Sequence, residues 1–235
     1  MPGVFILSAA RTPIGKFGGA LAGFTAPDLG VFAARAALER AAVEANDLEL
    51  AVFGHARQAG NGPNPARQIA YRAGLPAATP AYTVNQACAS GIQAIALAAQ
   101  AIECGEAELA LAGGIEAMSH VPYLLEGARW GARIGDQVLV DGMRRDGFLC
   151  PLSKMVMGET AELLANQYHI PREEQDAFAL ESQQRARRAI ESGRFRDEIV
   201  SVTVKDKKGE REFSTDEHPR FDASLEGLAK LPPAF

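Results

Sequence analysis

The feature that most constrains the fold of this chain is the regular alternation of short apolar runs with helix-forming segments over its first 116 residues. Thr25 precedes an alanine-rich stretch and can cap a helix there, and Asn64-Pro65 is a typical helix start. The apolar runs between the helices are Val4–Ser8, Leu50–Gly54, Tyr82–Asn85 and Leu109–Ile115. Strands separated by helices at this spacing pair in parallel, with helices on both faces of the sheet. The sequence therefore predicts an α/β fold.

The third helical segment, from Ser90 to Cys104, differs from the first two. Between Ile92 and Ile102 its only polar side chains are Gln93 and Gln100. A helix that is apolar on nearly every side is typical of a protein interior. We therefore expect this helix to lie between layers of the fold.

The character of the sequence changes after about Glu116. Residues 120–155 are rich in Gly, Arg and Asp, and two helices are predicted over Met157–His169 and Pro171–Gly193. Ile199–Val204 and Glu210–Phe213 have the pattern of a polar hairpin. We interpret residues 1–116 as a core domain and residues 117–235 as an inserted α+β domain that lies over it.

Composition excludes several classes of function. The net charge is −5, with acidic and basic residues interspersed, so a nucleic-acid partner is not expected. No apolar run is long enough to cross a membrane, and the start of the chain lacks the pattern of a secretory signal. The three cysteines have no metal-ligand spacing. We expect reduced thiols, no metal and a cytoplasmic location.

Cys88 is the candidate for chemistry because it stands in a turn between a strand and the apolar helix, in the segment Val84-Asn-Gln-Ala-Cys-Ala-Ser-Gly-Ile92. Free amides at a helix start favour the thiolate form of a cysteine and can donate to an oxyanion on an attacked thioester. The small residues around Cys88 leave space for an acyl group. From the residues alone, Cys88 is either a nucleophile or a small apolar side chain in a tight turn.

The motifs along the chain resemble those of the thiolase family. The resemblance begins with Ser8-Ala-Ala-Arg-Thr-Pro13, continues through the Cys88 segment and Leu111-Ala-Gly-Gly-Ile-Glu-Ala-Met-Ser119, and includes Met157-Gly-Glu-Thr-Ala-Glu162, Glu174-Gln-Asp-Ala-Phe178 and Gly193-Arg-Phe195. These motifs are collinear and cover the whole chain. The resemblance implies a thiolase-like layered fold in which residues 117–235 form the loop domain.

This resemblance also implies acyl transfer through an acyl-cysteine at Cys88, closest to the reversible acetyl-CoA C-acetyltransferase reaction. Phe148, Met157, Arg220 and Phe235 match family positions that contact CoA or the acyl group. The implied small-molecule partners are acetyl-CoA, CoA and 3-ketoacyl-CoA. The CoA thioester is a substrate, no cofactor is permanently bound, and self-association as a dimer or tetramer is expected.

Some features depart from the family pattern. Val156 stands where many short-chain members have a histidine, and Gly227 replaces a serine that often contacts CoA. The family's catalytic Gly-His-Pro histidine, its Cys-x-Gly cysteine and its Asn-Glu-Ala-Phe motif lie in a carboxy-terminal domain that this chain does not contain. The Glu-His218-Pro sequence is not expected to replace that histidine. His55, His120, His169, Cys104 and Cys150 are expected to have packing or surface roles.

The sequence is also compatible with other functions. Val156 favours a 3-ketoacyl-CoA thiolase of broader chain length over strict acetoacetyl specificity. Ketosynthases and hydroxymethylglutaryl-CoA synthases share the implied fold, but the motifs after residue 117 match thiolases. A function of another class is a truncated, non-catalytic CoA-binding or assembly module.

Overall fold

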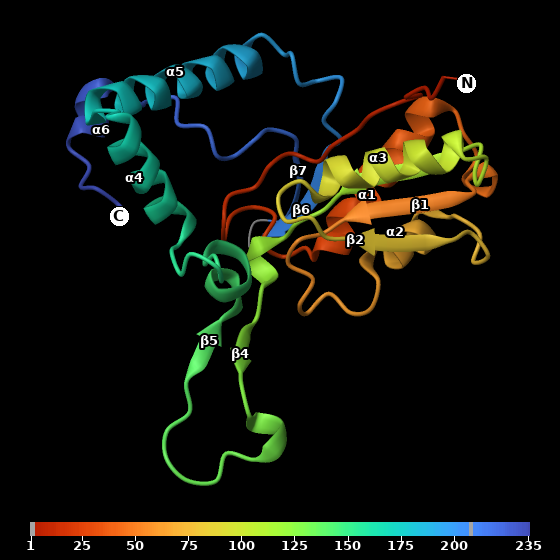
Figure 1. The fold of residues 1–235 in the computed structure, drawn as a ribbon. Coiled ribbons are helices and arrows are strands. Elements are labelled where there is room, and N and C mark those ends of the chain that lie inside the picture. Colours follow the sequence, from red (N-terminus) through yellow and green to blue (C-terminus); the bar gives the residue numbers. More distant parts are fainter. Residues whose placement is uncertain (1–2, 207–208) are drawn as a thin grey trace.

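The computed structural model describes residues 3–206 and 209–235 (Figure 1). The helices are α1 (Ala26–Ala41), α2 (Pro65–Ala73), α3 (Ser90–Glu103), α4 (Met157–Tyr168), α5 (Arg172–Glu191) and α6 (Leu225–Ala229). The strands are β1 (Leu50–Gly54), β2 (Ala81–Val84), β3 (Ala110–Gly114), β4 (Tyr123–Leu125), β5 (Leu139–Asp141), β6 (Val202–Asp206) and β7 (Gly209–Phe213). Single 3-10 turns and one π-helical turn, Arg144–Phe148, lie between them.

The predicted parallel sheet is confirmed over three strands, in the order β2-β1-β3. Helices α1 and α2 cover one face and α3 covers the other (Figure 1). Local signals account for these helices: Thr25 and Asp28 form a capping box at α1, and the Asn64 side chain caps α2, which begins at Pro65 and ends at Gly74. The structure therefore has helices on both faces, as the sequence predicts.

Strand β1 is the centre of the core because helices pack on both of its faces. Ala51 and Phe53 face the α1 and α2 side, while Leu50 and Val52 face α3. All five residues of β1 are buried. This explains why the run Leu50–Gly54 is apolar throughout rather than alternating in polarity.

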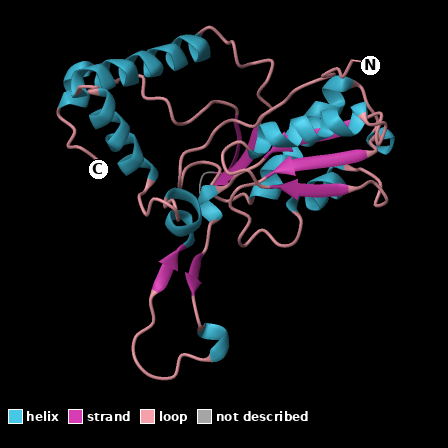
Figure 2. Cartoon of the chain, viewed as in Figure 1, coloured by secondary structure: helices cyan, strands magenta, loops and turns pink. Residues whose placement is uncertain are grey.

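The prediction of a strand at Val4–Ser8 is wrong. The segment is drawn as a loop that leads from the amino-terminal end towards the sheet (Figure 2), and it joins no described strand. Phe5 and Ile6 are 80% and 81% exposed. The run has the composition of a buried strand, but no described strand hydrogen-bonds to it.

The expectation for α3 is also only partly met. Ala94, Ala98 and Ala101 are buried against the sheet. Ile92 and Ile95 are 75% and 49% exposed, so the opposite face of the helix has no covering layer among the described residues. The apolar composition of α3 therefore exceeds what its single packed face requires.

The chain after Glu116 has two kinds of structure. Strands β4 and β5 form an antiparallel arm that extends away from the sheet, and α4, α5 and α6 gather at a distance from it (Figures 1 and 2). Both long helices occur where the sequence predicts them. However, Phe178, which shares an apolar stripe of α5 with Ala186, Ala189 and Ile190, is exposed.

Strands β6 and β7 pack against the first part of the chain. The hairpin is confirmed, but the expectation that it is polar is wrong for one face. Val202, Val204 and Phe213 are buried in a small core with Leu21 and its neighbours. Alternation along β6 puts these valines on the inner face and polar side chains on the outer face.

Arg11, at the end of the amino-terminal segment, makes charged contacts with residues near the carboxyl end of the chain. Its guanidinium donates two hydrogen bonds to the Asp216 carboxylate, at 2.8 and 3.0 Å, and one to Glu198 at 2.7 Å. The same guanidinium lies over the Phe195 ring. A bidentate pair fixes orientation as well as distance, so Arg11 holds the end of the amino-terminal segment in place.

Candidate active site

The candidate site lies where the three parallel strands end. The segments that follow β1, β2 and β3 begin with His55, Asn85 and Ile115, and in open α/β sheets ligands bind outside the carboxyl ends of the strands. The turn that contains Cys88 follows β2 directly. Cys88 is exposed, as a thiol that reacts with a substrate must be.

The turn before α3 is fixed by hydrogen bonds within it. The Ser90 hydroxyl accepts from the Gln86 N–H at 2.8 Å and donates to the Ala87 carbonyl at 2.6 Å. The Asn85 side chain accepts from the Ala87 N–H at 2.9 Å and donates to the Ala56 carbonyl at 2.9 Å. These bonds stabilise Ala87 at a φ of 50°, a left-handed conformation that alanine adopts at a cost. The turn therefore holds Cys88 in one place.

Glycines at the strand ends bring α3 directly against the sheet. A Cβ on Gly54 would overlap the backbone of Ser90, and a Cβ on Gly114 would lie 3.0 Å from the Gly91 Cα. The sequence predicted that Gly91 leaves room for an acyl group. A Cβ on Gly91 would lie 3.5 Å from the Gly114 Cα, an ordinary contact distance, so the close packing depends on Gly54 and Gly114 rather than on Gly91.

A buried cluster of charged side chains lies beside this packing. His55 is 1% exposed, and its Nε2 lies 3.2 Å from Oε1 of Glu116. That distance is within hydrogen-bond range, although the geometry of the two atoms is not that of a well-aligned hydrogen bond. Burial acts to raise the pKa of Glu116, but contact with His55 and the charge of Arg57 outweigh it and hold the pKa below its ordinary value.

Arg57 connects this cluster to Phe148. The Arg57 backbone N–H donates to Glu116 at 3.3 Å, and its guanidinium lies 4.9 Å from the centre of the Phe148 ring. Phe148 ends the π-helical turn and is half-buried. From the sequence, His55 is expected to have a packing or surface role, and neither Arg57 nor Glu116 stands out. Their positions directly after β1 and β3 were the signal that could have identified them.

Two of the other predicted contacts lie near each other. Met157 is the first residue of α4 and is half exposed. The Phe235 ring lies against Gly158, where a Cβ would overlap it. Phe235 therefore lies beside the start of α4, next to Met157. Val156, whose N–H donates to Glu159 at 2.7 Å, precedes this helix and caps it through the backbone.

Arg220 lies apart from these residues in the contacts that the structure shows. Its side chain is exposed and its backbone N–H donates to Gln183 at 2.7 Å. Within residues 3–206 and 209–235, no hydrogen bond, ion pair or ring contact joins Cys88 to Phe148, Met157, Arg220 or Phe235. The structure thus places the predicted residues at three locations: the strand ends, the start of α4 and, for Arg220, beside Gln183 of α5.

The remaining candidates have the surroundings of ordinary side chains, with one exception. His218 and Cys104 are exposed. Cys150 is the exception, because hydrogen bonds from the Ser153 side chain and backbone lower the pKa of its thiol. Among the described residues, no group of three or more His, Cys, Asp or Glu side chains could hold a metal ion. The described helices include none that could cross a membrane.

Residues 4–235 match the family described as the thiolase N-terminal domain. The acetyl-CoA acetyltransferase of Pseudomonas aeruginosa is 50% identical over all of this chain and 60% of its own length. A probable acetyl-CoA acetyltransferase of Escherichia coli is 48% identical over the same shares. The solved structure of the acetyl-CoA acetyltransferase from Syntrophomonas wolfei has a TM-score of 0.93 and 46% identity, over 98% of this chain and 58% of that one. The chain thus spans about 60% of the length of the curated relatives it matches.

Proposed function

The chain belongs to the thiolase family through its amino-terminal domain, and from that premise we propose that it contributes the acyl-accepting part of an acetyl-CoA C-acetyltransferase. Members of this family use CoA thioesters as substrates and hold no bound cofactor. The observation that carries the proposal is the exposed Cys88 thiol, held by the Asn85–Ser90 turn at the start of α3.

The proposed step is transfer of an acetyl group to Cys88. The Cys88 sulfur, as a thiolate, attacks the carbonyl carbon of acetyl-CoA, and a tetrahedral oxyanion forms. The oxyanion collapses, the bond to the CoA sulfur breaks, and CoA leaves after taking up a proton. In this proposal the Cys88 backbone N–H donates to the oxyanion, since the Ala89 and Ser90 N–H groups already donate to the Gln86 and Ala87 carbonyls. The residues that move protons and activate the second substrate belong to the remaining part of the relatives.

The CoA contacts in this proposal come from the second part of the chain. Phe148, held under Arg57, is assigned to the pantetheine, while Met157 and Phe235 at the start of α4 are assigned to the acyl group and its surroundings. Arg220 is assigned to the nucleotide end of CoA. We retain residues 1–116 as the core domain and 117–235 as the loop domain. Self-association as a dimer or tetramer and a cytoplasmic location are part of the same proposal.

Incubation with acetyl-CoA followed by intact-mass measurement tests the proposal. We expect one acetyl adduct that disappears in Cys88→Ser. Cys150→Ser is the matched control, because the lowered pKa of Cys150 makes it the competing thiol, and it should leave the adduct in place. The same variants are made in a fusion to the carboxy-terminal part of the Pseudomonas aeruginosa relative. An unmodified Cys88 in both proteins would exclude the nucleophile assignment and favour a non-catalytic CoA-binding or assembly module.

A broader 3-ketoacyl-CoA thiolase is the second candidate. It is favoured by Val156, which precedes Met157 at the start of α4 where many short-chain members have a histidine. The fusion protein separates the two functions through its turnover of acetoacetyl-CoA and of a longer 3-ketoacyl-CoA. A marked preference for acetoacetyl-CoA supports the acetyltransferase, and comparable turnover supports the broader enzyme.

A further inference from the structure

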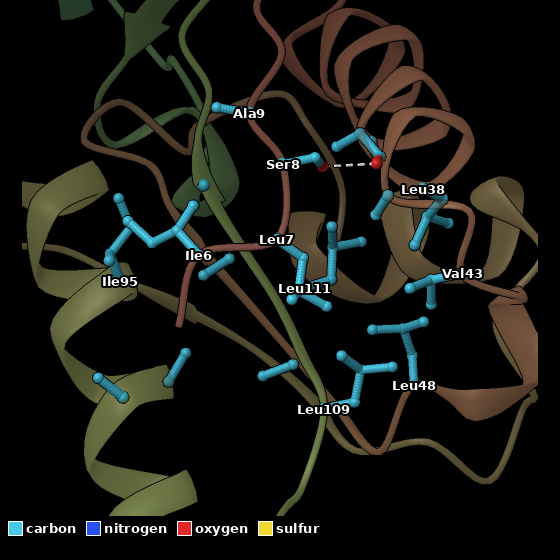
Figure 3. Close-up of a pocket in the computed structure, with 18 of the residues that line it drawn as sticks. Ile6, Leu7, Ser8, Ala9, Leu38, Val43, Leu48, Ile95, Leu109 and Leu111 are labelled. Atoms are coloured by element: carbon cyan, nitrogen blue, oxygen red, sulfur yellow. Dashed lines mark hydrogen bonds between the residues drawn. The ribbon is translucent and has the colours of Figure 1, made fainter. Parts of the chain in front are cut away.

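The interior around the parallel sheet holds an apolar cavity and a separate cluster of buried polar side chains. The cavity measures about 540 Å³ and lies between the amino-terminal segment, α1, α3 and β3 (Figure 3). Its lining is mostly aliphatic, and the Ser8 hydroxyl in it already donates to the Ala37 carbonyl. In the cluster beyond the strand ends, by contrast, Arg57 is only 9% exposed, and its Nε has no hydrogen-bond partner among the described residues. Burying a guanidinium is costly, so the contacts that compensate for the burial indicate what Arg57 does.

Arg57 packs against the π-helical turn. A Cβ on Gly147 would overlap the Arg57 guanidinium, and the centre of the Phe148 ring lies 4.9 Å from the guanidinium carbon. The guanidinium therefore contacts two consecutive residues of the turn, the first at its backbone and the second at its ring. A planar cation over an aromatic ring is attracted to that ring, and more strongly where water is excluded. Arg57 thus fixes where the turn lies, and with it Phe148.

Glu116 holds Arg57 on the side of the sheet. One carboxylate oxygen of Glu116 accepts from the Arg57 backbone N–H at 3.3 Å and lies 3.9 Å from Nη1 of the same residue. Glu116 directly follows Ile115, whose N–H donates to the Gly54 carbonyl at 2.9 Å. The position of the guanidinium is therefore set relative to the ends of β1 and β3.

The residue before Arg57 holds the turn of the nucleophile. The Ala56 carbonyl accepts from the Asn85 side chain at 2.9 Å, and Asn85 is one of the residues that fix the Cys88 turn. Ala56 and Arg57 are adjacent in the chain. The segment after β1 therefore contacts the Cys88 turn through one residue and Phe148 through the next.

We propose that Arg57 is a positioning residue, which sets the place of Phe148 relative to the Cys88 turn and so the fit of the pantetheine arm of CoA to the nucleophile. The inference rests on the assignment of Phe148 to the pantetheine in the proposed function. Arg57 itself touches neither the thiol nor the acyl group in this role. Its loss should therefore weaken the binding of CoA and leave the intrinsic reactivity of the Cys88 thiol unchanged.

CoA binding, measured by isothermal titration calorimetry on the chain and on the fusion protein described above, provides the first test. Arg57→Met should raise the dissociation constant of CoA about tenfold, because the ring of Phe148 loses its buried partner. Arg72→Met is the matched control, since Arg72 also forms an ion pair, at 2.7 Å to Asp28, on α2, and it should bind CoA as the unchanged protein does. Acetylation of Cys88 by p-nitrophenyl acetate, which has no pantetheine, should have the same rate in all three proteins.

A double-variant cycle separates positioning from a general loss of structure. Phe148→Leu should itself weaken CoA binding, and adding Arg57→Met to it should change the dissociation constant by less than about twofold, because Arg57 then has no ring to hold. Losses from the two variants that multiply in the double variant would overturn the proposal. Acetylation by p-nitrophenyl acetate that slows in Arg57→Met as much as CoA binding weakens would also overturn it.

Gly147→Ala tests the same contact without removing Arg57 or Phe148, and it decides the case in which Arg57→Met does not fold. Its Cβ would displace the guanidinium and should weaken CoA binding about threefold or more. Gly23→Ala, where a Cβ has no neighbour within 4 Å, should have no effect. Unchanged CoA binding in Gly147→Ala, or no CoA binding by the unchanged fusion protein, would overturn the proposal.

The binding measurement is independent of the proposed acyl transfer. If the unchanged protein binds CoA but acetyl-CoA leaves no adduct on Cys88, the acyl transfer is refuted, and weaker CoA binding in Arg57→Met still supports the positioning role. If the adduct forms and Arg57→Met binds CoA as tightly as the unchanged protein, the acyl transfer stands and the positioning role is refuted.

Discussion

Val4–Ser8 and Leu50–Gly54 are apolar runs of the same length, but the first is largely exposed and the second is buried. Leu50–Gly54 is β1, buried along its whole length between β2 and β3. Val4–Ser8 pairs with no described strand and exposes Phe5, Ile6 and Leu7. The comparison shows that apolar composition makes the burial of a run favourable. The run is buried only where neighbouring strands pair with it.

The two runs are also held by different interactions. Strand β1 has ladder hydrogen bonds on both sides and helices on both faces. The amino-terminal segment is held at its end by the Ser8 hydroxyl and by the charged contacts of Arg11. Substitutions should therefore affect the two runs very differently.

The largest difference is expected from the same substitution made in both runs. Val52 is fully buried, so Val52→Asp places an unpaired carboxylate in the core and should lower the free energy of unfolding by about 4 kcal/mol. Ile6→Asp changes an exposed side chain and should alter it by less than about 0.5 kcal/mol. Urea denaturation followed by circular dichroism measures both values. Equal losses would show that the amino-terminal segment is part of the core.

A smaller effect is expected at the end of β1, where the strand meets α3. Gly54→Ala would push a Cβ into the Ser90 backbone, which cannot move without displacing the Cys88 turn, and should cost about 2 kcal/mol. Gly23→Ala is the control, since a Cβ there has no neighbour within 4 Å. Thermal unfolding measures stability, and the rate of Cys88 alkylation reports the turn. An unchanged alkylation rate in a destabilised Gly54→Ala protein would show that the packing of α3 on Gly54 does not control the reactivity of Cys88.

The smallest effect is expected at the anchor of the amino-terminal segment, and it depends on pH. Burial acts to raise the pKa of Asp216, but hydrogen bonds from Arg11 and from the Ile14 N–H outweigh it and hold the pKa below its ordinary value. Because the pKa is lower in the folded state, this stabilisation is fully present above the unfolded pKa of about 4 and is lost as pH falls through the folded pKa.

Asp216→Asn should therefore cost about 1 kcal/mol near neutral pH, and the difference from the unchanged protein should shrink as the pH is lowered from about 5 to 2. Denaturant titrations at a series of pH values measure it. Asp136→Asn, on the exposed β4–β5 arm, is the control and should show no such dependence. A difference that grows at low pH would contradict the pairing of Asp216 with Arg11.

Much of the fold could be predicted because its signals are local. The Thr25 capping box, the Asn64-Pro65 start and the apolar run of β1 each determine their own element. Burial could not be predicted in the same way, because it depends on what lies opposite. The apolar faces of α3 and α5, and the run Val4–Ser8, have the composition of buried surfaces and are partly exposed. In β6 the difference has the opposite sign. The hairpin is expected to be polar, but Val202 and Val204 on its inner face are buried.

The site was predictable only where a motif carries the chemistry. The segment around Cys88 identified the turn, and the structure shows how Asn85 and Ser90 hold it. The assignments of Phe148, Met157, Arg220 and Phe235 rest on resemblance and stay predictions. The cluster of His55, Arg57 and Glu116 went unrecognised because Glu116 is far in sequence from the other two and meets them only where β1 and β3 end side by side.

The close packing of α3 on the strand ends also affects how the position of Cys88 responds to substitutions elsewhere in the chain. Gly54, Gly91 and Gly114 meet through main-chain atoms alone, so the contact contains no torsion that a side chain could adjust. Repacking in the surrounding core can change rotamers without altering this spacing. The position of the Cys88 backbone above the sheet is therefore set by main-chain contacts, and it can stay the same while the side chains of the surrounding core vary.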